Sequence, residues 1–269
     1  MRRLLQSLLA LIASALFSMA GHAQPAEVSV YAAGSLRGAL ADVAQAWQAG
    51  KPDAKVKFTF GPSGLLKDRL AGGERADVFA SANMEHPQAL ATAGRAGTPK
   101  VFARNQLCAL VAPGVQASTA TLVSRMLDPA IRLGTSTPKA DPSGDYTWAM
   151  FERIEQRGHP GAYSTLSAKA LQLTGGPNSP PPPADRSAYG AVMAAGQADI
   201  FITYCTNAVV AVREVSGLRS IDVPADVNVS ASYGVSILNG APAEADRFVE
   251  FLLSPAGMTV LTRHGFASP

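Results

Sequence analysis

The sequence is poor in the residues that build metal clusters and charged binding surfaces. Only 2 of its 269 residues are cysteine and 4 are histidine. Two cysteines exclude a disulfide-dense scaffold and a multi-cysteine metal cluster, and the histidines form no pair at metal-ligand spacing. Lys and Arg total 23 against 20 for Asp and Glu, a formal net charge of +3. This near balance argues against a protein that binds nucleic acid through a strongly basic surface.

The sequence does contain a segment typical of a signal peptide, followed by a chain rich in apolar residues. Hydrophobic residues make up 47% of it, which suits a folded core, and its length fits one large or two modest domains. The basic start and the apolar run to Ala20 predict a signal peptide over 1–23 that is removed on export. A membrane anchor is the alternative, but the run is short for the ~20 residues that cross a bilayer. We therefore expect a mature protein in the periplasm.

Export changes how the two cysteines are interpreted. Cys108 lies in the strand-like segment 106–112, and Cys205 ends a second strand-like segment at 199–205. In an oxidising compartment, such a pair favours a disulfide. Two buried free thiols are the alternative, because spacing in the sequence does not fix a pairing.

The mature chain alternates segments typical of strands with segments typical of helices. Strand-like runs rich in Val, Ile and Phe are followed by runs whose apolar residues recur at helical spacing. The expected strands are 28–32, 55–60, 76–81, 107–111, 131–135, 200–204 and 229–238, and the expected helices are 36–49, 65–70, 146–157, 187–195 and 243–264. This order predicts an α/β fold made of two sets of strands, each a mostly parallel, doubly wound sheet.

Three strand-to-helix junctions carry a serine beside a glycine. They contain Ser35, Ser63 and Ser143. Helix N-termini carry partial positive charge and free N–H donors, so they can bind oxyanions without a cation. In an open α/β sheet, such junctions lie at the carboxyl ends of the strands, where ligands bind. Each serine can instead simply cap its own helix, which is the commoner use of serine there.

Several segments together resemble one known family. The segments are Tyr31-Ala-Ala-Gly-Ser-Leu36, Gly61-Pro-Ser-Gly-Leu65, Ala76-Asp-Val-Phe-Ala-Ser-Ala82 and the C-terminal run from Phe248 through Phe266. In this order they resemble the periplasmic molybdate-binding protein family, the substrate-binding component of the molybdate ABC transporter. The resemblance implies a two-lobed periplasmic binding protein of type II with two crossover strands. Lobe I would comprise 24–105 and 238–269, and lobe II would comprise 106–237.

The resemblance also implies a function and a set of ligand contacts. A monomer would capture molybdate, and tungstate as well, in the cleft between the lobes and deliver it to a membrane ABC permease. It would need no cofactor, no metal bound directly and no nucleic acid. Matched position by position, the implied contacts are the hydroxyls of Ser35 and Ser63, the backbone N–H of Ser143, the side chain of Tyr204, and a backbone N–H near Arg186 or Ser187.

The segment around Arg186 departs from the family pattern. Asp185, Arg186 and Ser187 follow four consecutive prolines, where the family usually has a small apolar residue. An arginine in the cleft can hold an anion through two hydrogen bonds, which would admit a receptor for another small oxyanion or anionic solute. Alternatively, Arg186 points to solvent or pairs with Asp185.

A serine hydrolase is the alternative from a different class of protein. Ser35 or Ser63 would serve as its nucleophile, but the motifs supply no histidine partner. The run Gly61-Pro-Ser-Gly64 is also not the Gly-x-Ser-x-Gly elbow of hydrolases. We therefore expect a binding protein rather than an enzyme.

Overall fold

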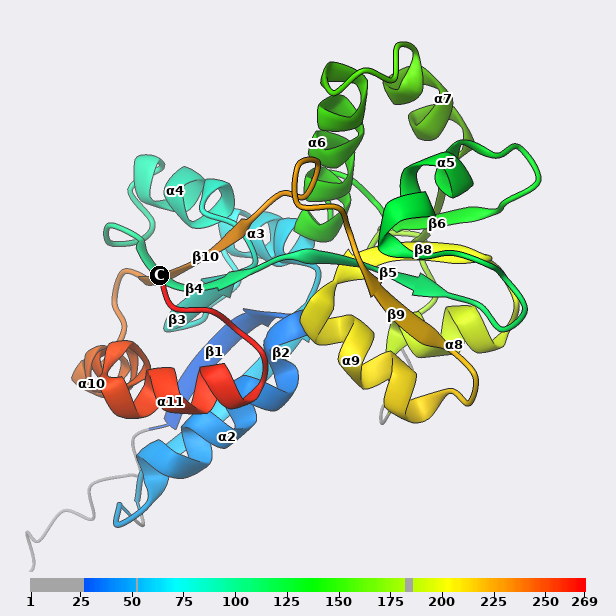
Figure 1. The fold of residues 1–269 in the computed structure, drawn as a ribbon. Coiled ribbons are helices and arrows are strands. Elements are labelled where there is room, and N and C mark those ends of the chain that lie inside the picture. The colour runs from blue at the N-terminus through cyan, green and yellow to red at the C-terminus, as the bar shows by residue number, and fades with distance from the viewer. Residues whose placement is uncertain (1–26, 52, 182–185) are drawn as a thin grey trace, which may run out of the picture.

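The computed structural model describes residues 27–51, 53–181 and 186–269 (Figure 1). The predicted signal peptide at 1–23 and Asp185 lie outside the described residues. Within the part that is described, no helix is long and apolar enough to cross a membrane. The chain folds into two lobes that lie side by side, each built on its own sheet.

The first sheet has five strands in the order β2-β1-β3-β10-β4. These are β1 (Glu27–Ala33), β2 (Lys55–Gly61), β3 (Val78–Ser81), β4 (Lys100–Asn105) and β10 (Ala231–Ile237). β1 pairs in parallel with β2 and β3, whereas β10 runs antiparallel to β3 and β4. Side chains alternate between the two faces of a strand, and both faces of β1 are covered, since Val30 and Tyr31 are both buried.

Helices cover both faces of this first sheet. α2 (Arg37–Gln48), α10 (Ala243–Leu253) and α11 (Pro255–Arg263) pack together on one face, and α3 (Ser63–Ala71) and α4 (Glu85–Thr92) pack on the other (Figure 1). Trp47 of α2 meets Phe248 of α10 edge to face, with ring centroids 5.4 Å apart. The chain breaks between α10 and α11 at Ser254, where Pro255 cannot continue the preceding helix.

The second sheet repeats this arrangement in the order β7-β6-β8-β5-β9. Its strands are β5 (Leu107–Val111), β6 (Leu133–Ser136), β7 (Leu171–Thr174), β8 (Ile200–Tyr204) and β9 (Arg219–Asp222). β6 is parallel to β7 and β8, and β5 is antiparallel to β8 and β9. Each sheet is therefore mostly parallel with one reversed strand, which confirms the predicted fold class.

Helices also sandwich the second sheet. α5 (Leu122–Leu127), α6 (Pro142–Gln156) and α7 (Ala162–Lys169) lie on one face, and α8 (Ala188–Ala194) and α9 (Cys205–Glu214) lie on the other. Short 3-10 turns precede α2 at Gly34–Leu36 (η1) and α5 at Thr119–Thr121 (η2). In β5, Leu107 and Ala109 face the first group of helices, and Cys108 and Leu110 face the second.

Two connections cross between the lobes. β4 runs into β5 through Gln106, and the chain returns between β9 and β10 (Figure 1). The placement of β10 corrects the predicted lobe boundary, because residues 231–237 pair with β3 and β4 in the first sheet rather than within lobe II. The sequence shows that this segment is a strand, but its partners are set by contacts with strands more than a hundred residues away.

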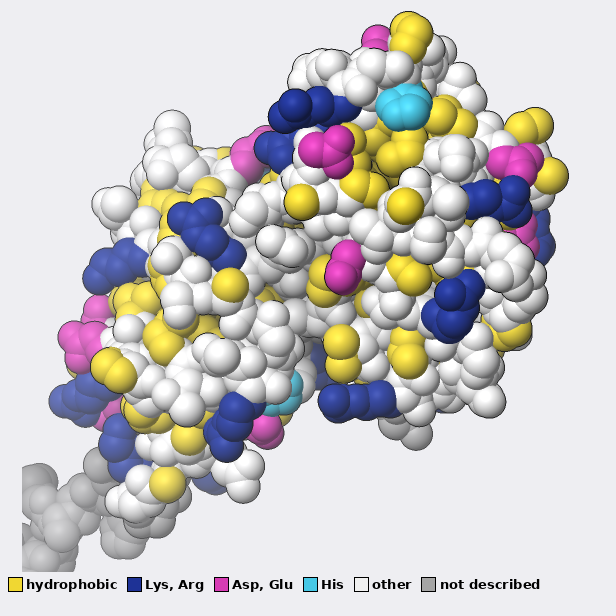
Figure 2. Space-filling model, in the orientation of Figure 1, with side chains coloured by type: hydrophobic (Ala, Val, Ile, Leu, Met, Phe, Trp, Pro, Cys, Tyr) yellow, Lys and Arg dark blue, Asp and Glu magenta, His cyan; other side chains and the backbone are white. Residues whose placement is uncertain are grey.

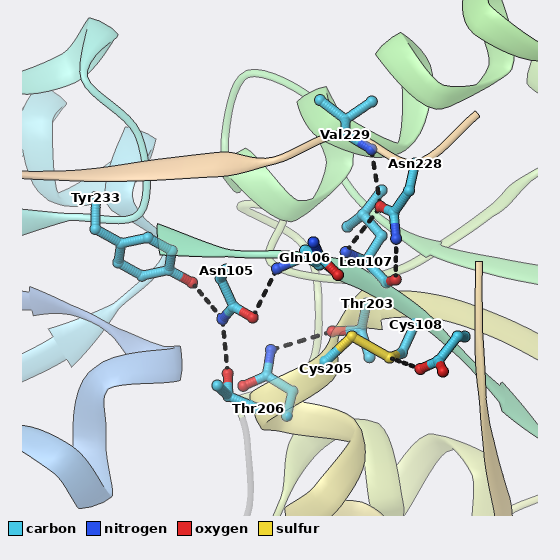
Figure 3. The surroundings of a disulfide bond; sticks show 12 residues. Asn105, Gln106, Leu107, Cys108, Thr203, Cys205, Thr206, Asn228, Val229 and Tyr233 are labelled. Carbon is cyan, nitrogen blue, oxygen red and sulfur yellow. Dashed lines mark hydrogen bonds between the residues drawn. A yellow bond between two sulfur atoms is a disulfide. The ribbon is translucent and has the colours of Figure 1, made fainter. Parts of the chain in front are cut away.

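A disulfide joins Cys108 of β5 to Cys205, the first residue of α9 (Figure 3). This is the pairing that the sequence favours, across a separation of 97 residues. Cys108 Sγ also lies 3.6 Å from Asp222 Oδ1. These three residues are the one grouping of metal-ligand type among the described residues, and the two sulfurs are bonded to each other rather than available as thiolates.

Candidate functional site

A cavity of about 600 Å³ lies between the lobes. Its wall is formed where strands end. The first sheet contributes Ser35 after β1, Ser63 after β2 and Ala82 after β3, and the second contributes Gly175 after β7 and Tyr204 at the end of β8. The carboxyl ends of both sets of parallel strands therefore face one space, which is the position where open α/β sheets bind ligands.

The lobes touch each other beside this cavity. The N–H of Gly64 donates a hydrogen bond to the carbonyl oxygen of Ala140 at 2.9 Å, and the Tyr204 hydroxyl donates to the carbonyl of Ala82 at 3.4 Å. A side chain at position 64 would overlap the carbonyl oxygens of Lys139 and Ala140. Glycine at this position is thus a condition for the lobes to come together.

Ser35 and Ser63 both line the cavity, and neither caps a helix. The N-cap residues of η1 and α3 are Ala33 and Pro62, which make no side-chain cap hydrogen bond. Ser35 Oγ lies 3.0 Å from the Tyr233 hydroxyl. Ser63 is 1% exposed and its Oγ accepts the N–H of Ala82 at 3.1 Å. Because that bond uses the oxygen, the Ser63 O–H can still donate to a ligand.

Tyr204 supplies a hydroxyl from the second lobe. It is the last residue of β8, is 1% exposed, and lines the cavity. Burial, with weaker effects from neighbouring Tyr233 and Asp141, raises the pKa of Tyr204 well above its ordinary value. The phenol therefore stays protonated at neutral pH, and its one O–H would have to leave the Ala82 carbonyl in order to donate to a ligand.

Ser143 does not reach the cavity, which corrects the predicted site. It is fully buried in the first turn of α6, and its N–H donates to Asp141 Oδ1 at 3.0 Å. The carboxylate of Asp141 caps α6 and occupies the backbone donor that the resemblance assigned to a ligand. Asp141, two residues earlier, lines the cavity in its place.

Arg186 and Ser187 both lie on the cavity wall. Ser187 caps α8, because its Oγ accepts the N–H of Gly190 at 3.2 Å, and its own N–H donates to Glu214 Oε2 at 2.7 Å. Arg186 is exposed on the same wall. A second arginine that lines the cavity is Arg37, whose guanidinium lies 4.6 Å from the ring centroid of Phe60. The wall thus carries positive charge on both lobes.

The sequence analysis missed Asp141 as a cavity residue. Burial is the main reason that the pKa of its carboxyl rises to about 6, while hydrogen bonds from the Ser143 N–H and the Ser136 hydroxyl oppose this rise. The signal was present, since Asp141 opens the same junction as Ser143. Only the fold shows that Asp141, rather than Ser143, lines the cavity.

A hydrogen-bonded chain connects the cavity wall to the crossover, and Figure 3 shows its part from Tyr233 through Asn105 to Thr206. Ser35 bonds Tyr233, and the Asn105 side-chain amide donates to both the Tyr233 hydroxyl at 3.3 Å and Thr206 Oγ1 at 2.9 Å. Asn105 ends β4, and Thr206 stands in the first turn of α9. One amide therefore ties the cavity wall of the first lobe to that of the second at the point where the chain crosses.

Neither serine has the partner that a hydrolase would need. The hydrogen bonds of Ser35 and Ser63 run to Tyr233 and to the Ala82 amide. In the described part of the chain, His264 pairs with Asp42 at 2.8 Å and His86 is buried in α4. Among the described residues, no histidine is therefore hydrogen-bonded to Ser35 or Ser63.

Comparison with known proteins places the chain in a family. The model of the bacterial extracellular solute-binding protein family matches residues 28–267. The molybdate-binding protein ModA of Mycobacterium tuberculosis is 30% identical over 256 residues, which cover 94% of this chain and 89% of that protein. An uncharacterized protein of Pasteurella multocida is 39% identical over 204 residues, which cover 74% of this chain and 81% of that protein. The chain belongs to the bacterial extracellular solute-binding proteins, within the molybdate-binding protein family.

Solved structures show the same fold at low sequence identity. The periplasmic molybdate-binding protein of Azotobacter vinelandii has a TM-score of 0.71 at 19% identity, covering 90% of this chain and 99% of that one. The sulfate-binding protein SubI of Mycobacterium tuberculosis has a TM-score of 0.74 at 16% identity, covering 90% and 86%. Because these neighbours differ in their stated ligands, the shared fold by itself does not select one oxyanion.

Proposed function

We propose that this protein captures molybdate in the interlobe cavity and delivers it from the periplasm to a membrane ABC permease. Tungstate, which has the same shape and charge, would bind in the same way. One observation carries the proposal: the hydroxyls of Ser35, Ser63 and Tyr204, drawn from both lobes, lie on the wall of one cavity. The kinship with molybdate-binding relatives supports the choice of ligand.

Uncharged donors are strong enough for this task. A hydrogen bond to a charged partner contributes ~1.5–3 kcal/mol. Several such bonds, less the free energy needed for closure and for desolvation of the anion, leave room for the ~8–12 kcal/mol of micromolar to nanomolar binding. A rigid set of donors spaced for long metal–oxygen bonds would hold the smaller sulfate and phosphate ions less well.

Closure of the lobes supplies the signal that a permease can recognise. The contact between Gly64 and Ala140 is made only when the lobes meet, and a ligand that bridges both lobes favours that state over the open one. The closed form would then present to the permease a surface that the open form lacks.

Titration calorimetry tests the proposal directly. The mature protein, residues 24–269, is titrated with molybdate, tungstate, sulfate and phosphate. We expect submicromolar to micromolar binding of molybdate and tungstate and weaker binding of the other two. A variant that combines Ser35→Ala and Tyr204→Phe is the control and should lose most of the heat. Clear binding of sulfate or phosphate with no heat from molybdate or tungstate would overturn the assignment.

A second candidate is a receptor for another small anionic solute. Arg37 and Arg186 on the cavity wall favour it, because guanidinium groups hold carboxylate and phosphate oxygens in pairs. The variant Arg186→Ala separates the two candidates. It should leave molybdate binding nearly unchanged if hydroxyls and amides hold the ligand, and it should abolish binding of a solute that depends on the guanidinium.

A further inference from the structure

A carboxylate stands on the wall of a cavity that is otherwise suited to anions. Asp141 follows the turn after β6 and caps α6, and its Oδ1 accepts the Ser143 N–H at 3.0 Å. Its other oxygen faces Gly175, where a Cβ would come within 2.5 Å of Oδ2. Gly175 also has a φ of +75°, a conformation that favours glycine. The carboxyl group is therefore held in place from two sides.

The position of Asp141 is fixed relative to the donors of the first lobe. Its neighbour Ala140 accepts the hydrogen bond from Gly64, which itself follows Ser63. The residue after Ser63 and the residue before Asp141 are thus joined by a backbone hydrogen bond. Both Ser63 and Asp141 line the cavity. An oxyanion held by Ser63 would therefore share its cavity with Asp141, next to the Gly64–Ala140 contact.

The charged groups around Asp141 decide how its carboxyl group titrates. Among the described residues, no ion pair includes Asp141. The titratable groups that influence it, or are influenced by it, are Asp145 on α6, Tyr189 on α8, Tyr204 on β8 and Tyr233 on β10. The other charged side chains of the cavity wall are Arg37, Arg186 and Glu214, and Lys139 stands on the preceding turn. Burial raises the pKa of Asp141 to about 6 even before an anion arrives.

We propose that Asp141 and the bound oxyanion share one proton, so that the site takes up a doubly charged oxyanion together with a proton from water. This inference rests on the proposed function for the location of the ligand. An ionised carboxylate beside a dianion would repel it, whereas a proton between the two oxygens turns the repulsion into a hydrogen bond. The proton balance is the same whether the proton resides on the carboxyl oxygen or on the ligand: well above the pKa of the free carboxyl group, one proton is consumed for each oxyanion bound.

The proposal fixes how affinity depends on pH. Below about pH 6 the free carboxyl group already carries the proton, so the affinity for a dianion is constant. Above that pH the free protein loses the proton and the complex keeps it. The dissociation constant then rises by about tenfold per pH unit, as linkage requires when one proton is taken up. At the high end of this range, about one proton per oxyanion should be absorbed from the buffer.

The test is calorimetry with molybdate at about pH 5, 6, 7 and 8 in buffers of different ionisation enthalpy. The wild-type protein should show the tenfold rise between pH 7 and pH 8 and the proton uptake. The variant Asp141→Asn keeps an oxygen that can accept the Ser143 N–H, so it should fold normally. Its dissociation constant should change by less than about twofold over the same range, and it should bind more tightly than wild type at pH 8. Thermal unfolding checks that it is folded.

The variant Asp145→Asn is the matched control. Asp145 stands on the same helix, its Oδ1 accepts the Lys139 N–H at 2.7 Å, and it is not part of the cavity wall. This variant should keep the wild-type slope. A flat wild-type profile without proton uptake, or an unchanged slope in Asp141→Asn, would overturn the proposal.

The result also separates this inference from the proposed function. If molybdate gives no heat but sulfate binds, the molybdate assignment fails and the same pH series is run with sulfate. A proton-linked slope that disappears in Asp141→Asn would then still support the shared proton. If no oxyanion binds to either protein at any pH, both proposals fail.

Discussion

Helix N-termini of both lobes lie at the same cavity, but they differ in how their backbone N–H groups are capped. In the first lobe, the starts of η1 and α3 have no side-chain cap. In the second, α6 and α8 are capped by their own Asp141 and Ser187. Capping consumes the donors that an anion would use. We call the first lobe, with Ser35 and Ser63, the donor side, and the starts of α6 and α8 the capped side; α9, which follows Tyr204 in the second lobe, also has no side-chain cap.

The lobes also differ in how they are held together. The second lobe contains the Cys108–Cys205 disulfide. Surface charge does not distinguish the lobes on the face that Figure 2 shows, because Lys, Arg, Asp and Glu are interspersed there. Two lobes with the same strand arrangement thus differ in covalent bonding, because the disulfide lies within the second lobe.

The largest effect should come from removal of the disulfide. The double variant Cys108→Ala, Cys205→Ala should lose about 2–5 kcal/mol of unfolding free energy, because the closed loop restricts the unfolded chain. Urea unfolding measures the loss, and the second lobe should unfold first. Reductant should destabilise the wild-type protein to a similar degree and leave the double variant unaffected. Equal stability of wild type and variant would show that the disulfide does not fasten this lobe.

Closure should be the next most sensitive feature. In Gly64→Ala, the new methyl group overlaps the carbonyl oxygens of Lys139 and Ala140 across the interface. We expect ligand affinity to fall by about 100-fold, or about 2.7 kcal/mol, with the melting temperature nearly unchanged. Gly97→Ala is the control, because a Cβ there meets only the Ile237 carbonyl oxygen at 3.8 Å. Wild-type affinity in Gly64→Ala would mean that the lobes need not meet.

The donor side should respond to the loss of a single hydroxyl. Ser63→Ala removes a group that can donate to the oxyanion, so affinity should fall by about ten- to 100-fold, the equivalent of one hydrogen bond to a charged partner. The variant also leaves the buried Ala82 N–H without its acceptor, so a lower melting temperature should accompany the change. Calorimetry and thermal unfolding on the same sample separate the two effects.

The capped side should respond least. Ser187→Ala removes the cap of α8 and should lower stability by about 1 kcal/mol, while ligand affinity changes by less than about threefold. Calorimetry compares it with Ser63→Ala under identical conditions. A loss of affinity as large as that of Ser63→Ala would contradict the division into a donor side and a capped side.

Some parts of the site follow from the sequence because they depend on local rules. Ser35 and Ser63 each follow the end of a strand, and parallel strands bring such ends to one edge, whereas Tyr204 was expected only from the family resemblance. Asp141 could not be found in this way. The sequence shows only a motif that contains both Asp141 and Ser143, and no local pattern tells that the Ser143 N–H donates to Asp141 Oδ1 rather than to a ligand.

The sequence by itself determined the α/β class and the cysteines that can pair, since these depend on periodicity and on the residue types present. The tertiary structure decided that β10 joins the first sheet and that the two lobes meet at Gly64. It also decided which helix starts remain open to a ligand. These features depend on contacts between residues far apart in the chain, whose free energies no local pattern encodes.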